Sequence, residues 1–352
     1  MNPVAPVPSD VPFDVPFALA TRRREDGGFE PLLAVDGVLV AVDPAATDAA
    51  ADPARLRALG AQAYLDRWDT ALDLLTAYVD RVRTAGVEDA LWYRGPLAPG
   101  DTSLASPIPA PRQVLCAASN YAKHVSDFKG REDIDTFRGI DRSTMMPYLF
   151  PKGPDSVSGP YDDVAYPAVT ARLDYEAELA VVLARGGRRV HPEKAGGHIA
   201  GYLAFNDLTS RDLQQRKDWP FFSTDWFAGK CFDGSAPMGP LLVPARFIPD
   251  YRALHLELRV NGDLRQSAPA GDMVFSVEEQ IAFASGITAL APGDVIATGT
   301  PDGVAMKTGQ WLHCGDVVET SVGPLGTQRV TIVEDRAASG DGFELAPPER
   351  TR

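Results

Sequence analysis

The sequence predicts an α+β fold dominated by β-structure, with a smaller N-terminal domain at residues 1–105 and a larger domain at 106–336. Three observations lead to this prediction. The length of 352 residues exceeds one typical domain. The stretch 95–113 is rich in proline, has little periodicity and marks a boundary. After it, few helical segments separate the apolar runs, which disfavours a doubly wound α/β fold. Residues 337–352 are expected to form a flexible tail.

The N-terminal domain contains one hairpin pattern and one helical pattern. Residues 29–42 read as two strands joined by a turn at Asp36-Gly37, a pair of residues that tight hairpin turns favour. Further on, apolar residues recur at spacings of three and four, which predicts a helix that packs one face against the core. The residues of this stripe are Trp68, Leu72, Leu75, Val79 and Val82.

The second domain is predicted to be rich in strands, at residues 114–118, 173–183, 255–260 and 295–298. Asn261-Gly262 follows the third of these strands and predicts a type I′ hairpin. A helix is expected over 276–283, because Ser276 and Glu279 have the spacing of a capping box.

The composition excludes several classes of function. Hydrophobic residues make up 45% and charged residues 23%, as in folded globular proteins. The formal net charge of −14 argues against nucleic acid or an anionic membrane as a partner. Three cysteines provide no disulfide framework, and no apolar run is long enough to span a bilayer. We therefore expect a cytoplasmic protein that acts on a small molecule.

The stretch 173–183 is the most informative part of the chain. It reads as a buried strand, and side chains alternate along a strand, so Asp174, Glu176 and Glu178 should share one face. Burying unpaired carboxylates costs several kcal/mol or more, so this face must either meet water or receive a cation. Carboxylate oxygens suit a hard divalent ion such as Mg²⁺. The alternative is a solvated edge of a sheet.

Two further segments carry candidate groups. His124 and Asp127 are three residues apart, so on one helical turn the carboxylate could orient the imidazole as a general base. This spacing also arises often by chance. Asp207 follows a strand of small residues and could provide another oxygen donor to a metal. Nearby, Arg211-Asp212 is better explained as a local ion pair that fixes the turn.

Two more segments lie towards the C-terminus. Lys230 is surrounded by aromatic residues and either reaches to water or is held beside anions. Residues 299–303 form a loop of Gly, Thr and Pro whose hydroxyl and backbone N–H groups could hold a carboxylate. A tight turn that requires glycine would explain this loop equally well.

Taken together, these segments resemble the fumarylacetoacetate hydrolase family. Its signatures occur here in family order over residues 112–330: NYAKH, MPYLFPKGP, DYEAELAVVL, GYLAFNDLTSRDLQ, WFAGKCFDGSAPMGP, VNGDLRQ, DMVFSV and PGDVIATGTPDGV. The resemblance implies a mixed β-roll catalytic domain, a homodimer and a divalent metal in a central cleft. Residues 1–105 look like the accessory domain of some members. Ala118 and Ser119 depart from the family, which often has Gly and a larger residue there.

The resemblance also implies roles for individual residues. Glu176, Glu178 and Asp207 would be metal ligands for Mg²⁺, or for Mn²⁺ or Ca²⁺. The catalytic group would comprise His124, Asp127 and Lys230, and Asp174 is a less certain ligand on the same strand face. The residues assigned to the substrate are Tyr121, Gln214 and Thr300.

The activity implied is metal-dependent hydrolysis of a C–C bond in a 2,4-dioxo acid of the acylpyruvate type. His124, oriented by Asp127, would activate the attacking water. Two alternatives stay open. The same metal and enolate chemistry serves a decarboxylase or an isomerase of oxo acids, which needs no attacking water. The chain could also be a catalytically silent family member that binds a metabolite.

Overall fold

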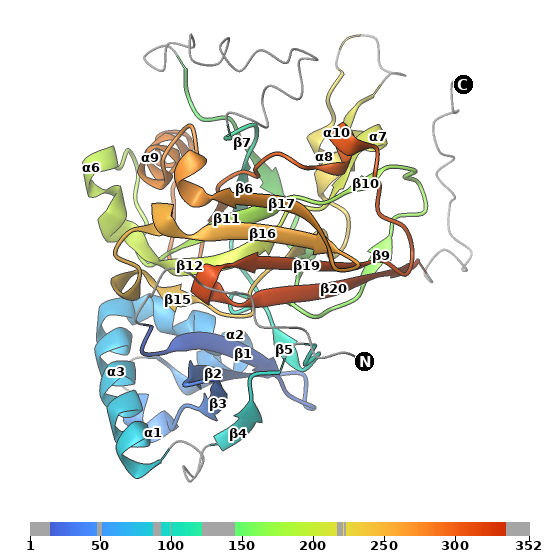
Figure 1. Ribbon diagram of the computed structural model, residues 1–352. Helices are drawn as coiled ribbons and strands as arrows, with labels where there is room; N and C mark the ends of the chain where they lie inside the picture. The colour runs from blue at the N-terminus through green and yellow to red at the C-terminus, as the bar shows by residue number, and fades with distance from the viewer. Residues whose placement is uncertain are drawn as a thin grey trace.

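The computed structural model describes residues 15–47, 51–86, 93–98, 100–121, 145–216, 221 and 223–335. The tail predicted at 337–352 lies outside these residues. The N-terminal unit forms a five-stranded sheet in the order β4-β3-β2-β1-β5, with helices along one side (Figure 1). Its strands are β1 (Ala18–Arg23), β2 (Phe29–Val35), β3 (Val38–Ala41), β4 (Tyr93–Pro96) and β5 (Leu104–Ala105). Its α-helices are α1 (Pro44–Thr47), α2 (Pro53–Leu59) and α3 (Trp68–Ala85), with a 3-10 helix at Gly60–Arg67.

The expected hairpin and helix of this unit are confirmed. β2 and β3 pair in antiparallel register across Asp36 and Gly37, whose φ angles of 50° and 83° are those of a type I′ turn. Helix α3 buries the whole predicted apolar stripe. Strand β1, which pairs with both β2 and β5, was not predicted.

The larger unit is built around a mixed six-stranded sheet in the order β15-β12-β11-β18-β6-β7. β18 and β6 run parallel, and the neighbouring pairs are antiparallel. The strands are β6 (Val114–Ala117), β7 (Leu149–Lys152), β11 (Ala177–Leu183), β12 (Ile199–Asn206), β15 (Val243–Pro244) and β18 (Val295–Ala297).

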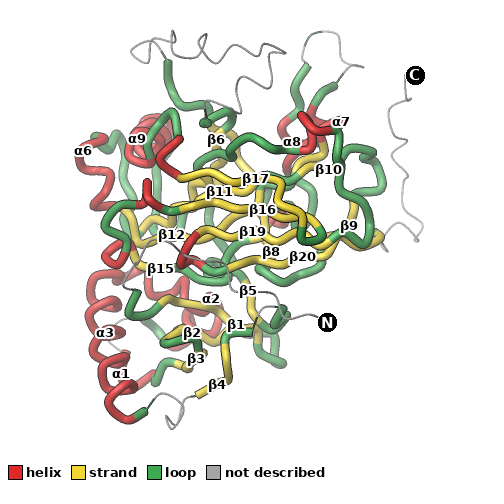
Figure 2. The backbone as a smooth tube through the Cα atoms, in the orientation of Figure 1, coloured by secondary structure: helices red, strands yellow, loops and turns green. Residues whose placement is uncertain are grey.

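A second sheet of the larger unit has the order β17-β16-β19-β20-β9. Its strands are β9 (Val164–Tyr166), β16 (His255–Val260), β17 (Asp263–Pro269), β19 (Val317–Val322) and β20 (Thr327–Glu334). The predicted hairpin at Asn261-Gly262 joins β16 to β17, with φ angles of 53° and 88°. Strands form the centre of this unit, and loops and helices surround them (Figure 2). The β-dominated α+β fold is therefore confirmed.

Short elements complete the larger unit. Two small sheets pair β10 (Leu173–Asp174) with β13 (Thr209–Ser210), and β8 (Val157–Ser158) with β14 (Ala236–Pro237). The helices are α6 (Pro192–Ala195), α7 (Arg211–Gln214), α8 (Trp226–Lys230), α9 (Val277–Ile287) and α10 (Ala305–Thr308). Helix α9 has the predicted capping box, because Ser276 and Glu279 bond to each other's backbone N–H groups. No helix in the described part of the chain is long and apolar enough to cross a membrane.

The main core passes through both units. Ala180 and Val182 of β11 pack into a cluster that also contains Leu33 of β2 and Tyr64 and Trp68 of the helical segment. The alternate residues of β11 point into a second core, which contains residues of helix α9. Because both faces of β11 are covered, its residues from Leu179 to Leu183 form an unbroken apolar run.

Candidate functional site

The backbone leaves the regular strand pattern at the acidic segment. The expected continuous strand over 173–183 is interrupted, because β10 ends at Asp174 and β11 begins at Ala177. Side chains satisfy the backbone N–H groups in the gap: the Asn206 amide oxygen accepts from Glu176, and the Gln266 amide oxygen accepts from Ala177. The break turns Asp174 away from the two glutamates.

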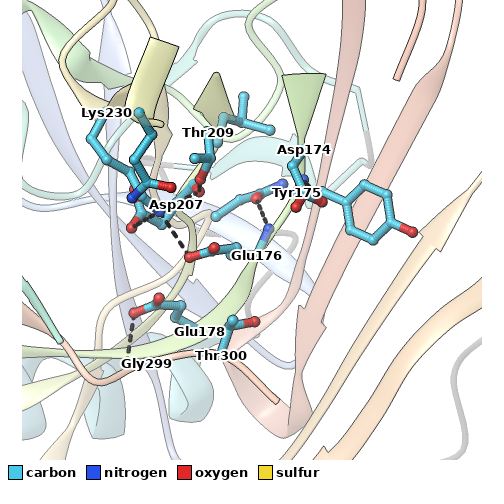
Figure 3. Close-up of polar contacts among 12 residues, drawn as sticks. Asp174, Tyr175, Glu176, Glu178, Asp207, Thr209, Lys230, Gly299 and Thr300 are labelled. Carbon is cyan, nitrogen blue, oxygen red and sulfur yellow. Dashed lines mark hydrogen bonds and ion pairs between the residues drawn. The ribbon is translucent and has the colours of Figure 1, made fainter. Parts of the chain in front are cut away.

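Three carboxylates are brought together as predicted. One oxygen each from Glu176, Glu178 and Asp207 lie within 4.8 Å of one another. The residues come from the start of β11 and from the loop after β12, and they face one another in Figure 3. Glu178 is fully buried, and Glu176 and Asp207 are 6% and 1% exposed. This burial excludes the solvated edge of a sheet.

Buried lysines compensate part of this charge. The Lys230 ammonium donates to Glu176 Oε2 at 2.9 Å and to Asp207 Oδ2 at 2.7 Å, so it bridges two of the carboxylates. Lys152 donates to the other oxygen of Asp207 at 2.7 Å. Lys230 therefore lies beside anions, and the alternative in which it reaches to water is wrong, because it is 2% exposed.

Arg211 provides a third buried cation, which corrects the expected local pair with Asp212. The Arg211 guanidinium bonds to Asp174 Oδ2 at 2.7 Å and also to Glu176 Oε1. Asp212 instead accepts from the backbone N–H of Ala171. Asp174 lies close to the first turn of α7 because β10 pairs with β13, which places Asp174 opposite Thr209. Asp174 also accepts from the backbone N–H of Ala305, so it is an anchor for Arg211 and not a fourth member of the carboxylate cluster.

Glu178 is the least compensated of the carboxylates. Its Oε2 accepts the backbone N–H of Gly299 at 2.8 Å, but its Oε1 is buried and has no hydrogen-bond partner among the residues that the structure describes. Gly299 must be glycine, because its φ is 100° and a Cβ there would lie 2.7 Å from Asn120 Cβ. Burial, together with the neighbouring charges of Asp207 and Glu176, raises the pKa of Glu178 well above 4.5.

The unsatisfied oxygen provides a test of whether a divalent metal fits this site. A buried polar atom without a partner is rare and costs free energy. Here it belongs to a set of hard oxygen donors at suitable mutual distances, which is the donor chemistry of Mg²⁺ and Mn²⁺. The residues therefore fit such an ion, and Glu176, Glu178 and Asp207 are the side chains that would bind it.

We expect metal binding to release a proton below the raised pKa of Glu178. A protonated carboxyl must ionise to bind a cation, so Mg²⁺ affinity should rise with pH up to this pKa and then level off. Between pH 4.5 and the raised pKa, the folded metal-free protein holds a proton that the unfolded chain has lost, so its stability should fall as pH rises. Calorimetric titrations in buffers of different ionisation enthalpy measure the released proton. Metal binding that is independent of the buffer at mildly acidic pH would contradict this expectation.

A cavity of about 380 Å³ opens beside the carboxylates. Its polar side contains Glu176, Arg211, Gln214, Lys230 and Thr300. Its other lining residues include Ala118 and Ser119, the two positions that depart from the family pattern, and an aromatic group. The volume is in the range of small-molecule sites.

The structure brings together some of the predicted substrate residues. Gln214 lines the cavity and accepts from Arg211 Nη1 at 3.2 Å. Thr300 also lines it, and its hydroxyl donates to the Ala177 carbonyl at 2.8 Å. Tyr121 is buried, and its hydroxyl has no hydrogen-bond partner in the described part of the chain, but Tyr121 is not among the lining residues of the cavity. The predicted base and its partner, His124 and Asp127, lie outside the described residues.

The geometry agrees with what a comparison with known proteins finds. The family model described as "Fumarylacetoacetate (FAA) hydrolase C-terminal" matches residues 113–333. The chain belongs to the fumarylacetoacetate hydrolase family. Within it, the oxaloacetate tautomerase YisK of Bacillus subtilis (strain 168) is 39% identical over 231 residues, which cover 64% of this chain and 72% of the relative.

Two solved structures of the fumarylacetoacetate hydrolase family extend the comparison. Maleylpyruvate hydrolase from Sphingobium sp. SYK-6 is 26% identical with a TM-score of 0.66, and the match covers 90% of this chain and 99% of that one. The match therefore reaches into the N-terminal unit. Fumarylpyruvate hydrolase from Pseudomonas aeruginosa, in complex with Mn²⁺ and pyruvate, is 32% identical with a TM-score of 0.54. That match covers 64% of this chain and 91% of the hydrolase.

For this family member, sequence reasoning missed two of the buried cations. Lys152 lies within the MPYLFPKGP signature, at the end of strand β7. A lysine at the end of an apolar strand could have indicated a buried carboxylate beside it, which is Asp207. Arg211 was identified but given the wrong partner. Three buried carboxylates, Asp174, Glu176 and Asp207, are thus held by Lys152, Arg211 and Lys230.

Proposed function

We propose that this protein is a divalent-metal-dependent enzyme that hydrolyses a C–C bond in a 2,4-dioxo acid of the acylpyruvate type. The observation that carries the proposal is the buried cluster of Glu176, Glu178 and Asp207 beside a cavity lined by Arg211 and Lys230. Oxygen donors for a hard cation and two side-chain cations at one end of a cavity suit an oxo acid, which is an anion and passes through an enolate. The names of related maleylpyruvate and fumarylpyruvate hydrolases support this class of substrate.

The chain's own residues would bind and orient the substrate. Gln214, at the polar side of the cavity, would donate from its amide nitrogen to the carboxylate of the 2-oxo acid. Thr300 would donate to the same carboxylate once its hydroxyl turns from the Ala177 carbonyl. Lys230, whose ammonium is held between Glu176 and Asp207, would offset the negative charge that develops on the 2-oxygen. A bound divalent ion would supply Lewis-acid stabilisation of that same charge.

Hydrolysis requires a general base that activates the attacking water. We assign this role to His124, with Asp127 as the residue that orients it. Removal of a proton from water lets its oxygen add to the 4-carbonyl carbon of the substrate. The C3–C4 bond then breaks, and the products are a carboxylic acid and the enolate of pyruvate, which takes up a proton at C3. A histidine is suited to this step because its usual pKa is near neutral pH, at about 6.5.

A second candidate function is tautomerisation of a 2-oxo acid, in which a proton moves between C3 and the 2-oxygen without an attacking water. The 39% identity with an oxaloacetate tautomerase favours it. The carboxylate cluster and Lys230 serve both reactions, so they do not decide between them. Mg²⁺, with Mn²⁺ or Ca²⁺ as alternatives, a homodimeric state and a cytoplasmic location complete the proposal.

The deciding experiment is a product assay with wild-type protein and a His124→Ala variant. Metal-loaded protein is incubated with acylpyruvates and with oxaloacetate, and the products are identified. For a hydrolase, His124→Ala should lower acylpyruvate cleavage by roughly 10²- to 10⁴-fold, the usual contribution of a general base. Metal affinity, measured by calorimetry, should stay unchanged because His124 is not a proposed ligand. Near-normal cleavage in the variant would remove the water-activation role of His124. Wild-type protein that leaves acylpyruvates intact but speeds the keto–enol exchange of oxaloacetate would favour the tautomerase.

A further inference from the structure

An aromatic wall forms the side of the cavity that the proposed chemistry does not use. It consists of Tyr148, Phe150 and Trp226, which all line the cavity. The rings of Phe150 and Trp226 are stacked, with centroids 4.3 Å apart and an interplanar angle of 19°. Trp226 Nε1 donates to the Tyr148 hydroxyl at 3.1 Å, so the three side chains hold one another in place.

The aromatic wall contacts the charged side chains through Phe150 and Lys230. The Lys230 ammonium lies 5.4 Å from the centroid of the Phe150 ring, within the range of a cation–π contact. One face of Phe150 therefore contacts Trp226, while Lys230 is directed at its π system. The cavity consequently has a polar end at Lys230 and Arg211 and an apolar end at Trp226 and Tyr148.

The charges of the lining residues limit what the apolar end can accept. Among the described lining residues, the positively charged ones are Arg211 and Lys230, and both are already bonded to Glu176. A second carboxylate placed against the aromatic wall would lose water without gaining a cation from the described lining residues, which costs free energy. An apolar or aromatic group placed there would gain contact area and ring stacking.

We propose that the wall of Tyr148, Phe150 and Trp226 selects substrates whose distal acyl group is apolar, and aromatic in the best case. This inference rests on the proposed function, because it assumes that the oxo-acid end binds at Lys230 and Arg211. A dicarboxylate such as oxaloacetate fits the polar end but gains nothing from the wall. The wall therefore determines specificity, while the carboxylate cluster determines the chemistry.

Binding of two inert probes to the metal-loaded protein tests this inference without turnover. 2-Oxo-4-phenylbutanoate has a phenyl group to place against the wall, and 2-oxobutanoate has none. Wild-type protein should bind the phenyl probe at least about tenfold more tightly, because an aromatic contact adds to the area that it buries. Trp226→Ala should remove most of this ratio. Trp226→Phe is the matched control, because it keeps a ring on Phe150 and should keep most of the ratio.

The outcomes separate failure of the inference from failure of the proposed function. Equal affinity for both probes in wild-type protein, or a ratio that Trp226→Ala leaves intact, would overturn the specificity role. A wild-type protein that binds neither probe and converts neither acylpyruvates nor oxaloacetate would overturn the proposed function itself. Oxalate, which has no distal group, should bind wild-type and Trp226→Ala protein equally. Weaker oxalate binding by the variant would show that Trp226 acts on the polar end instead.

Discussion

Replacing Lys230 with methionine should destabilise the metal-free protein by about 3–5 kcal/mol, the usual cost of breaking a buried ion pair from one side. Lys230 is 2% exposed and bridges Glu176 and Asp207, so its loss leaves each carboxylate with only one of its two cations. A divalent ion can replace that missing charge. Mg²⁺ should therefore stabilise the variant more strongly than the wild type, and thermal or urea unfolding with and without Mg²⁺ measures the difference.

The control for this experiment is Lys194→Met, which removes the same charge from an exposed position on α6. It should change the free energy of unfolding by no more than about 0.5 kcal/mol. Equal stabilities of Lys230→Met and Lys194→Met would mean that the bridge between Glu176 and Asp207 does not hold in solution. A variant that Mg²⁺ fails to stabilise would argue against a metal between these carboxylates.

Replacing Glu178 with glutamine should lower kcat/KM by roughly 10²- to 10⁴-fold, because Lewis-acid stabilisation is worth several kcal/mol. The amide keeps one oxygen, so it can still accept the Gly299 N–H, but it cannot provide a negative charge to a metal. The same change removes a buried carboxylate whose pKa is raised by burial. The metal-free variant should consequently be at least as stable as the metal-free wild type.

These two effects of Glu178→Gln have opposite signs, which separates a lost metal ligand from general damage to the fold. Glu193→Gln is the control, since that side chain is 88% exposed. Mg²⁺ affinity by calorimetry and melting temperature after chelation are the two measurements. Wild-type Mg²⁺ affinity in Glu178→Gln would exclude Glu178 as a ligand. A large loss of stability without metal would mean that its carboxylate is needed for packing.

The parts of the fold that could be predicted are those with a strong local cause. The turns at Asp36-Gly37 and Asn261-Gly262 need positive φ angles at both positions, and Asp, Asn and Gly are the residues that adopt such angles most readily. The stripe on α3 and the capping box of α9 likewise depend on residues close in sequence. Strand β1 was missed although it forms a hairpin with β2 across residues 24–28, where Asp26-Gly27 was a local turn signal; only its pairing with β5 depends on a distant segment.

In the candidate site, too, the features with a local cause in the sequence were the predictable ones. The clustering of Glu176 and Glu178 was predicted from strand alternation. Asp207 was a candidate donor because of its place after a strand, and the family resemblance then assigned it as a ligand. The break after Asp174 could not be predicted, because Asn206 and Gln266, whose side chains accept from the backbone N–H groups there, come from distant parts of the chain. Without the pairing of β10 with β13, Arg211 had no visible partner other than Asp212. Tertiary contacts decide which cationic side chain pairs with a carboxylate that is distant in the sequence, and a single sequence does not record these contacts.

The core that passes through both units has a consequence for cooperativity. Leu33 and Tyr64 of the N-terminal unit share one apolar cluster with Val182 of β11, the strand that begins beside the carboxylate cluster. Removing residues 1–105 would expose the face of β11 that this cluster covers. The two units therefore cannot unfold independently, and heat should melt them in a single transition. A substitution that leaves a cavity at Leu33 would therefore lower the stability of β11, the strand that positions Glu178, although the two residues are far apart in the sequence.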